Sequence, residues 1–198
     1  TNYFEKYLIG DIKTILQLND SEIRFGGLGY TCTLLVLIAM ELLGEIDLEA
    51  TTKDRSTKTN IKSPEIKHFI GLMPAKYNSN NVDNILVDSV RNGIAHCFMP
   101  NYGVAIGLKN CRHLDINSDG NILINAEEFF NDFFKVYINI KTSWKGIEEQ
   151  VENVLIKISK RLDNEKTKPI ISKTTTLEVT KATITGTSPV LSAGVSPT

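Results

Sequence analysis

The sequence has little cysteine, and its cysteines lack the spacing of a metal site. Cys32, Cys97 and Cys111 are an odd set with no C-x-x-C pair. A disulfide framework and a zinc knuckle both need paired cysteines, so this set argues against either. Unpaired thiols are typical of reducing compartments. We therefore expect a cytoplasmic protein with no metal site and no cofactor.

The chain also lacks an excess of charge of one sign. It has 22 basic and 23 acidic residues, and its formal net charge is −1 at pH 7. No overall positive field attracts a polyanion, so any contact with nucleic acid must use a local patch. Residues 50–62 are polar and aperiodic, which predicts an exposed loop. Basic residues gather in it, namely Lys53, Arg55, Lys58 and Lys62; taken alone, they indicate only a solvated loop.

A hydrophobic run long enough to cross a membrane is missing as well. The most apolar stretch, CTLLVLIAMELLG (32–44), contains Glu41 and is shorter than the roughly 20 residues that a bilayer requires. It predicts a buried helix over about 30–43, ended by Gly44, in the middle of a helical bundle. The sequence shown opens with no basic segment followed by an apolar run, so we expect neither a signal peptide nor a membrane partner.

Helical periodicity is what the sequence does contain. Apolar residues recur at helical spacing over 3–18, over 64–73, over 82–98 and from Ala126 to about Asn164. The last pattern is too long for one straight helix on a compact bundle, so we expect a kink near Gly146 or a partner chain that covers part of it. Length and composition fit one mainly α domain over 1–165.

Two stretches depart from this periodicity. Between about 103 and 125, short apolar segments flank Ser118-Asp119-Gly120, which predicts a small antiparallel β-hairpin insert. The same segment imitates a calcium-binding loop, but Ala126 stands where the bidentate glutamate belongs, so we prefer the turn. Residues 166–198 are rich in Thr and Ser with few charges, and we expect them to form a flexible low-complexity tail.

The helix predicted over 82–98 contains an arginine in its most hydrophobic part. Arg91 falls on one stripe with Val87, Ile94 and Phe98, so we expect it to face the core. A buried guanidinium needs a partner, either a carboxylate such as Asp88 or one on a neighbouring helix, or an anionic ligand. A structural ion pair and an anion site are both consistent with this pattern.

Three further residues of this helix bear on the same question. Asn92 and His96 are four positions apart, so the amide can orient the imidazole. Gly93 costs about 1 kcal/mol relative to alanine inside a helix. Its benefit is close approach, because another backbone or a ligand can come within contact distance.

Residues 91–96, RNGIAH, resemble the R-x4-6-H motif of the HEPN superfamily (higher eukaryotes and prokaryotes nucleotide-binding domains), in which a polar residue commonly follows the arginine. The mostly helical context over residues 3 to about 160 is similar too. The resemblance implies a HEPN-like helical bundle and a homodimer in which the motif helices of two copies meet at a shared cleft. In the toxin branch the motif extends to R-x4-H-x-Y, and here Phe98 occupies the tyrosine position.

The resemblance also implies an activity, that of a metal-independent endoribonuclease. His96 would act as general acid and base, helping the ribose 2′-oxygen attack the neighbouring phosphate and leaving a 2′,3′-cyclic phosphate. Arg91 would bind that phosphate and stabilise its developing charge. Asn92 would hold the histidine or contact the phosphate. The basic residues of the 50–62 loop would then supply contacts to the RNA backbone.

Two other interpretations stay open. One is a non-catalytic HEPN-like module that binds RNA, a nucleotide or a protein partner such as an antitoxin. The other is a helical protein without a ligand, in which Arg91 closes an ion pair in the core. The intact motif favours the ribonuclease, whereas Phe98 in the tyrosine position and the neutral net charge favour the alternatives.

Overall fold

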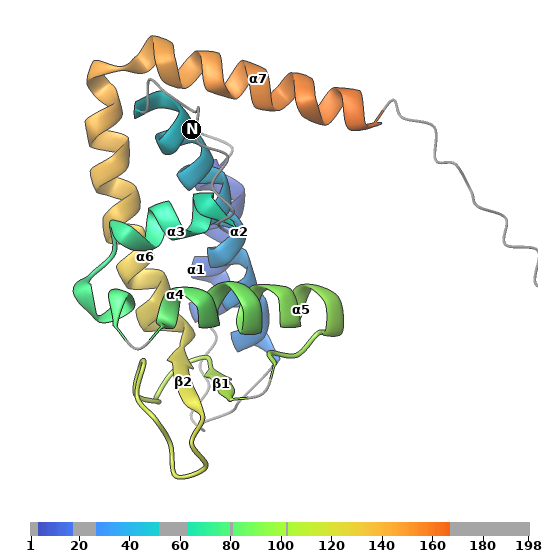
Figure 1. Ribbon diagram of the computed structural model, residues 1–198, viewed down its shortest axis with the longest axis vertical. Helices are drawn as coiled ribbons and strands as arrows, with labels where there is room; N and C mark the ends of the chain where they lie inside the picture. The colour runs from blue at the N-terminus through green and yellow to red at the C-terminus, as the bar shows by residue number, and fades with distance from the viewer. Residues whose placement is uncertain (1–3, 18–26, 52–62, 80, 102, 167–198) are drawn as a thin grey trace, which may run out of the picture.

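The computed structural model describes residues 4–17, 27–51, 63–79, 81–101 and 103–166 (Figure 1). The four basic residues expected to contact RNA, Lys53, Arg55, Lys58 and Lys62, lie outside these ranges, as does the predicted tail beyond residue 166.

The described chain is mainly helical, as the periodicity predicts. Its longer helices are α1 (Gly10–Gln17), α2 (Leu28–Thr51), α3 (Pro64–Gly71), α6 (Ala126–Ser143) and α7 (Glu148–Lys166). Shorter pieces are the π-helical segments Phe4–Ile9 and Ile85–Arg91, the 3-10 turns Ala75–Asn78 and Trp144–Gly146, and the helices α4 (Val82–Asn84) and α5 (Asn92–Cys97). Two strands, β1 (Val104–Gly107) and β2 (Ile122–Asn125), complete the fold. Among the described helices, none combines the length and the apolar character that a bilayer crossing requires.

Helix α2 is the centre of the bundle. It packs against α1, α3, α6 and α7. Its buried residues lie on one half of the helix, and the partly buried Leu34, Leu35 and Leu42 pack against the core beside them, which is why its sequence is apolar nearly all round. The prediction that Gly44 ends this helix is wrong, because the helix continues to Thr51. A Cβ at Gly44 would overlap the backbone carbonyl of Glu65. The glycine therefore lets α2 and α3 come into backbone contact.

The long C-terminal pattern is broken where a kink was predicted. Helix α6 ends at Ser143, a 3-10 turn covers Trp144–Gly146, and α7 leaves in a new direction to project beyond the rest of the molecule (Figure 1). Ion pairs of Lys157 with Glu49, at 2.8 Å, and of Arg161 with Glu45, at 2.6 Å, hold α7 against α2.

The prediction of an antiparallel hairpin is wrong for the two strands. β1 and β2 are parallel, with Val104 paired to Ile122 and Gly107 to Asn125. The chain between them, residues 108–121, is long enough for the crossover that parallel strands require. Part of this crossover pairs antiparallel with the other edge of β2, through an Ile116–Ile122 bridge.

The predicted turn is nevertheless present within the crossover. Gly120 has φ +79° and its N–H donates to the Asn117 carbonyl at 3.0 Å. The Asn117 side-chain oxygen accepts hydrogen bonds from the N–H groups of Asp119 and Asn121. The Asp-Gly signal thus predicted the turn correctly. The segment that pairs with β2 across this turn is residues 114–117, through an isolated bridge, whereas β1 lies on the opposite edge of β2.

Candidate functional site

The RNGIAH motif begins at the junction of two helical geometries. A π-helical segment runs over Ile85–Arg91 and α5 continues over Asn92–Cys97. Val87 and Ile94 are buried, as the stripe predicts. Single π-helical turns within helices are frequent at functional sites. The motif helix therefore has one face in the core, and Arg91 lies at the edge of that face.

Arg91 has an acidic partner on the central helix. Its Nη2 atom lies 3.0 Å and 3.2 Å from the two carboxylate oxygens of Glu41 on α2. Its Nη1 atom donates to the side-chain oxygen of Asn92 at 3.1 Å. The side chains of Arg91 and Glu41 are 31% and 36% exposed, so the pair is in contact with water. The partner is a carboxylate on a neighbouring helix, one of the alternatives that the sequence left open.

His96 lies elsewhere on the helix and is exposed. Five helical positions rotate the side-chain direction by about 140°, so His96 and Arg91 leave α5 on different faces. The sequence led us to expect that the Asn92 amide orients the imidazole of His96. Its oxygen instead accepts a hydrogen bond from Arg91, so this amide orients the guanidinium. One copy of the chain therefore places Arg91 and Asn92 together and leaves His96 apart.

Gly93 permits a close approach, but the group that approaches belongs to the same chain. A Cβ at this position would lie 2.7 Å from the Met99 carbonyl oxygen and from the Asn101 nitrogen. The turn that follows the helix folds back against it, since the Asn101 N–H donates to the Ser89 carbonyl at 2.8 Å. The expectation of close approach is confirmed, and its structural cause is this turn.

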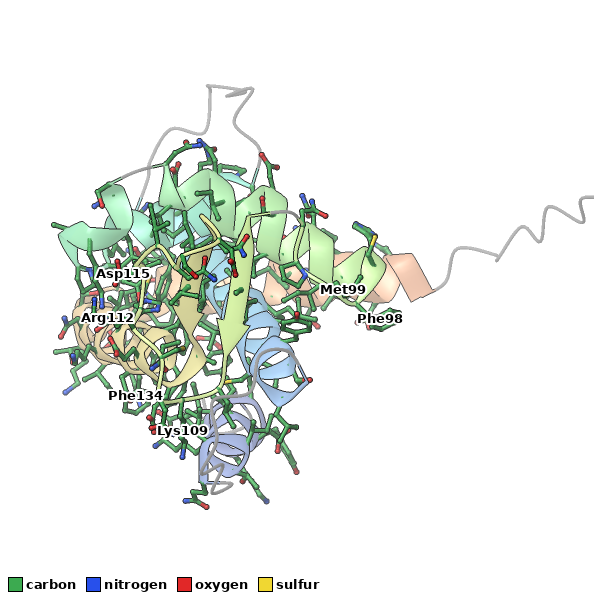
Figure 2. All side chains as sticks on the ribbon, turned by 90° about the horizontal axis from the view of Figure 1, so that it is seen from below. Phe98, Met99, Lys109, Arg112, Asp115 and Phe134 are labelled. Atoms are coloured by element: carbon green, nitrogen blue, oxygen red, sulfur yellow. The ribbon has the colours of Figure 1, made fainter. Side chains whose placement is uncertain are left out.

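The turn presents two apolar side chains to solvent. Phe98 is 82% exposed and Met99 is 62% exposed. Figure 2 shows both at the far end of α5, on the opposite side of the molecule from Arg112 and Asp115. Phe98 ends the helix in the left-handed conformation, with φ +58°. The helical spacing predicted that Phe98 faces the core together with Val87 and Ile94. The left-handed turn instead directs its side chain into solvent.

A second polar cluster lies at the other end of the fold, and no motif pointed to it. His113 accepts a hydrogen bond at Nδ1 from the Asn125 N–H at 3.1 Å, so its Nε2 carries the proton and donates to the Tyr77 hydroxyl at 2.7 Å. Tyr77 in turn donates to Asp132 at 3.1 Å. Lys76 closes the chain with an ion pair to Asp132 at 2.7 Å.

The pKa values in this cluster favour a neutral histidine beside a charged carboxylate. Burial, and then the charge of Lys76, lower the pKa of His113 to about 4. Burial by itself would raise the pKa of Asp132, but hydrogen bonding and charge from Lys76 outweigh it and hold that pKa below its ordinary value. Burial and the nearby Asp132 charge raise the pKa of Tyr77 far above its usual range. Since both nitrogens of His113 are engaged, this cluster is a structural connection.

His68 also has a structural contact. Its Nε2 atom lies 2.9 Å from one oxygen of Asp47, and the other oxygen accepts the Trp144 indole N–H at 2.8 Å. Asp47 thus connects α2, α3 and the turn between α6 and α7. Within the described residues, no three His, Cys, Asp or Glu side chains gather as a metal site would require.

Comparisons with known proteins give no match. Neither a protein-family model, nor a curated protein, nor a solved structure is similar to this chain.

Proposed function

We propose that this chain is a metal-independent endoribonuclease of the HEPN type, with an active site that two copies complete together. The observation that carries the proposal is the arrangement of RNGIAH. Arg91 is half-exposed at the edge of the core, while His96 is exposed on a different face of the same short helix. A phosphodiester that needs both groups can meet Arg91 of one copy and His96 of the other where two such helices pack together.

The proposed chemistry needs few groups. The imidazole of His96 removes the proton from a ribose 2′-hydroxyl, and the 2′-oxygen attacks the adjacent phosphorus. The bond to the 5′-oxygen breaks, that oxygen takes up a proton, and the products are a 2′,3′-cyclic phosphate and a 5′-hydroxyl. Arg91 donates hydrogen bonds to the non-bridging oxygens and stabilises their growing charge. Asn92, which already contacts Nη1 of Arg91, keeps the guanidinium in place.

Glu41 must give up Arg91 for a phosphate to bind. An ion pair exposed to this degree contributes only about 0–1 kcal/mol. Charge-assisted hydrogen bonds from a guanidinium to a phosphate are short and comparatively strong. The exchange of one anion for another is thus energetically accessible, and Glu41 keeps the arginine ordered in the absence of RNA.

The first test is cleavage of single-stranded RNA in EDTA by purified protein. We expect His96→Ala and Arg91→Met each to abolish cleavage without changing helical circular dichroism. Arg161→Met is the matched control, because Arg161 also pairs with a glutamate of α2 but lies on α7. Equal cleavage by His96→Ala and the parent protein would exclude His96 as the catalytic base.

A mixing experiment tests whether the site is shared. If one active site takes Arg91 from one copy and His96 from the other, a heterodimer of the two inactive variants contains one intact site. Mixed Arg91→Met and His96→Ala proteins should then recover part of the activity. No recovery, with dimers present in analytical ultracentrifugation, would contradict the shared site.

The pairing of Arg91 with Glu41 also favours a second candidate, a non-catalytic HEPN-like module that binds RNA, a nucleotide or a protein partner. A guanidinium already neutralised by an internal acid suits reversible binding as well as catalysis. This module would bind RNA in fluorescence anisotropy without cleaving it, and Arg91→Met would weaken that binding. If Arg91→Met changes only the unfolding free energy, Arg91 is a structural ion-pair residue.

A further inference from the structure

The end of the motif helix exposes an aromatic ring in an unfavourable backbone conformation. Phe98 has φ +58° and ψ +14°, the left-handed region that large side chains rarely adopt. Phe98 is 82% exposed, so burial of its ring does not offset the cost of this backbone conformation. Backbone strain of this kind persists where the surrounding structure imposes it, and it concentrates at binding sites.

The surrounding turn holds the backbone of Phe98 in place. The Phe98 N–H donates to the Ile94 carbonyl at 3.0 Å, which closes the last turn of α5. Three residues on, the N–H of Asn101 donates to Ser89 and its side-chain amide to the Asp88 carbonyl at 3.1 Å. Gly93 allows the backbone of the turn to lie directly against the helix. Phe98 is therefore presented to solvent by an anchored segment.

We propose that Phe98 is a stacking platform for a nucleobase of single-stranded RNA, next to the phosphate bound by the motif. This inference rests on RNA being the ligand of the proposed function, and it adds a base-binding residue to that site. Aromatic rings stack on bases with little sequence preference, since every base has a π-face. Stacking needs no hydroxyl group, so phenylalanine in the tyrosine position retains this capacity.

The size of the apolar surface favours a base over a protein surface. The exposed apolar pair here is Phe98 and Met99, whereas a stable protein interface covers roughly 800 Å² on each partner. One ring with an adjoining methionine matches the area of a single base. Phe98 also follows His96 by only two residues, so both lie at the same end of the motif helix.

The test is a fluorescence titration of Phe98→Trp with an uncleavable 2′-O-methyl oligonucleotide. The chain has one tryptophan, Trp144, which is buried and gives a constant background. We expect saturable quenching of the new tryptophan by the oligonucleotide. An abasic oligonucleotide of the same length and charge should cause no quenching, because it has phosphates without bases.

Cleavage kinetics give a second readout. Phe98→Ala should raise KM about tenfold, the loss expected for one stacked base, and leave kcat nearly unchanged. Phe98→Tyr should restore the parent KM. Leu162→Ala is the control, since Leu162 is also an exposed large apolar residue but lies on α7, and it should change neither constant.

Three results would overturn the stacking role. The first is that the abasic oligonucleotide quenches Phe98→Trp as strongly as the oligonucleotide with bases. The second is an unchanged KM in Phe98→Ala. The third is a lower molar mass of Phe98→Ala in ultracentrifugation, which would make Phe98 a protein contact. Failure of the proposed ribonuclease is separately visible. In that case His96→Ala cleaves like the parent, while base-dependent quenching of Phe98→Trp still establishes the stacking site.

Discussion

Arg91 lies where the motif helix meets α2, and its surroundings determine what its charge can do. Glu41 balances that charge, and Asn92 holds a second nitrogen of the same guanidinium. Because the pair is exposed to water, its two members can separate at low cost. The same carboxylate also repels any phosphate that approaches the arginine. At the scale of the residue, Glu41 therefore both orders Arg91 and competes with an anionic ligand.

Replacing Glu41 should strengthen RNA binding. Glu41→Gln keeps the shape of the side chain and removes its negative charge, so we expect the Kd for single-stranded RNA to fall severalfold at low salt. The effect should shrink as salt rises, because exposed charges are screened within about 10 Å at 0.1 M. Fluorescence anisotropy at two salt concentrations measures both.

The control for this variant is Glu45→Gln. Glu45 is also on α2 and pairs with Arg161 of α7, so its replacement should leave the Kd for RNA unchanged. Weaker binding by Glu41→Gln than by the parent would show that the carboxylate is needed to position Arg91.

At the scale of the element, the helices could be predicted from the sequence, but the pairing of the two strands could not. Periodic apolar residues predicted α1, α3, α6 and α7, and the break between α6 and α7 falls at the expected place. Helical hydrogen bonds are local, so local sequence is enough to predict them. Strand pairing joins distant segments. The turn at Gly120 was correctly predicted, but which edge of β2 receives β1 depends on how the crossover packs.

Gly44 also shows the difference between local and long-range prediction. Its local sequence signal predicted the end of a helix, whereas its role in the structure is a contact between two helices. Gly44→Ala adds a methyl group that meets the backbone of Glu65. Overpacking of this kind typically costs about 1–3 kcal/mol, and we expect a loss of that order or larger, because backbone yields less than a side chain. Urea unfolding followed by Trp144 fluorescence measures it.

Gly71→Ala is the matched control for the helix contact. Gly71 ends α3, and a Cβ built there has no atom of the described structure within 4 Å. This substitution should be neutral or slightly stabilising, since alanine lowers the entropy of the unfolded chain. A similar loss in both variants would mean that the α2–α3 contact does not decide the effect at Gly44.

Across the whole molecule, buried polar groups connect parts of the chain that are far apart in sequence. Asp47 links α2 to α3 and to the turn before α7. The chain of hydrogen bonds from His113 through Tyr77 to Asp132 joins the crossover, the 3-10 turn Ala75–Asn78 and α6. His113 and Asp132 have pKa values in the folded protein below their ordinary ones, so their protonation is linked to global stability.

This linkage predicts a loss of stability in mild acid. The pKa of His113 is about 4 in the folded protein, against an ordinary value of 6.5. Between these values the unfolded chain binds a proton that the folded chain excludes, so stability present above pH 6.5 falls progressively toward pH 4. The full shift corresponds to about 3 kcal/mol. The lowered pKa of Asp132 acts in the same direction at still lower pH.

Urea unfolding between pH 7 and pH 4 measures this dependence. His113→Gln removes the titrating group while keeping polar atoms at the position, and its stability should vary less over that interval although it is lower at pH 7. An equally steep pH dependence in this variant would assign the acid sensitivity to other groups.

The sequence by itself determined the helical class, the apolar central helix, the kink before α7 and the motif residues that raise the question of function. These depend on short-range periodicity and on residue type. Only the tertiary structure decided that Glu41 faces Arg91 from 50 positions away, that β1 and β2 are parallel, and that the neighbour of Gly93 is its own chain. The reason is physical: long-range contacts depend on how faces pack in three dimensions, and neither spacing nor composition specifies which distant faces meet.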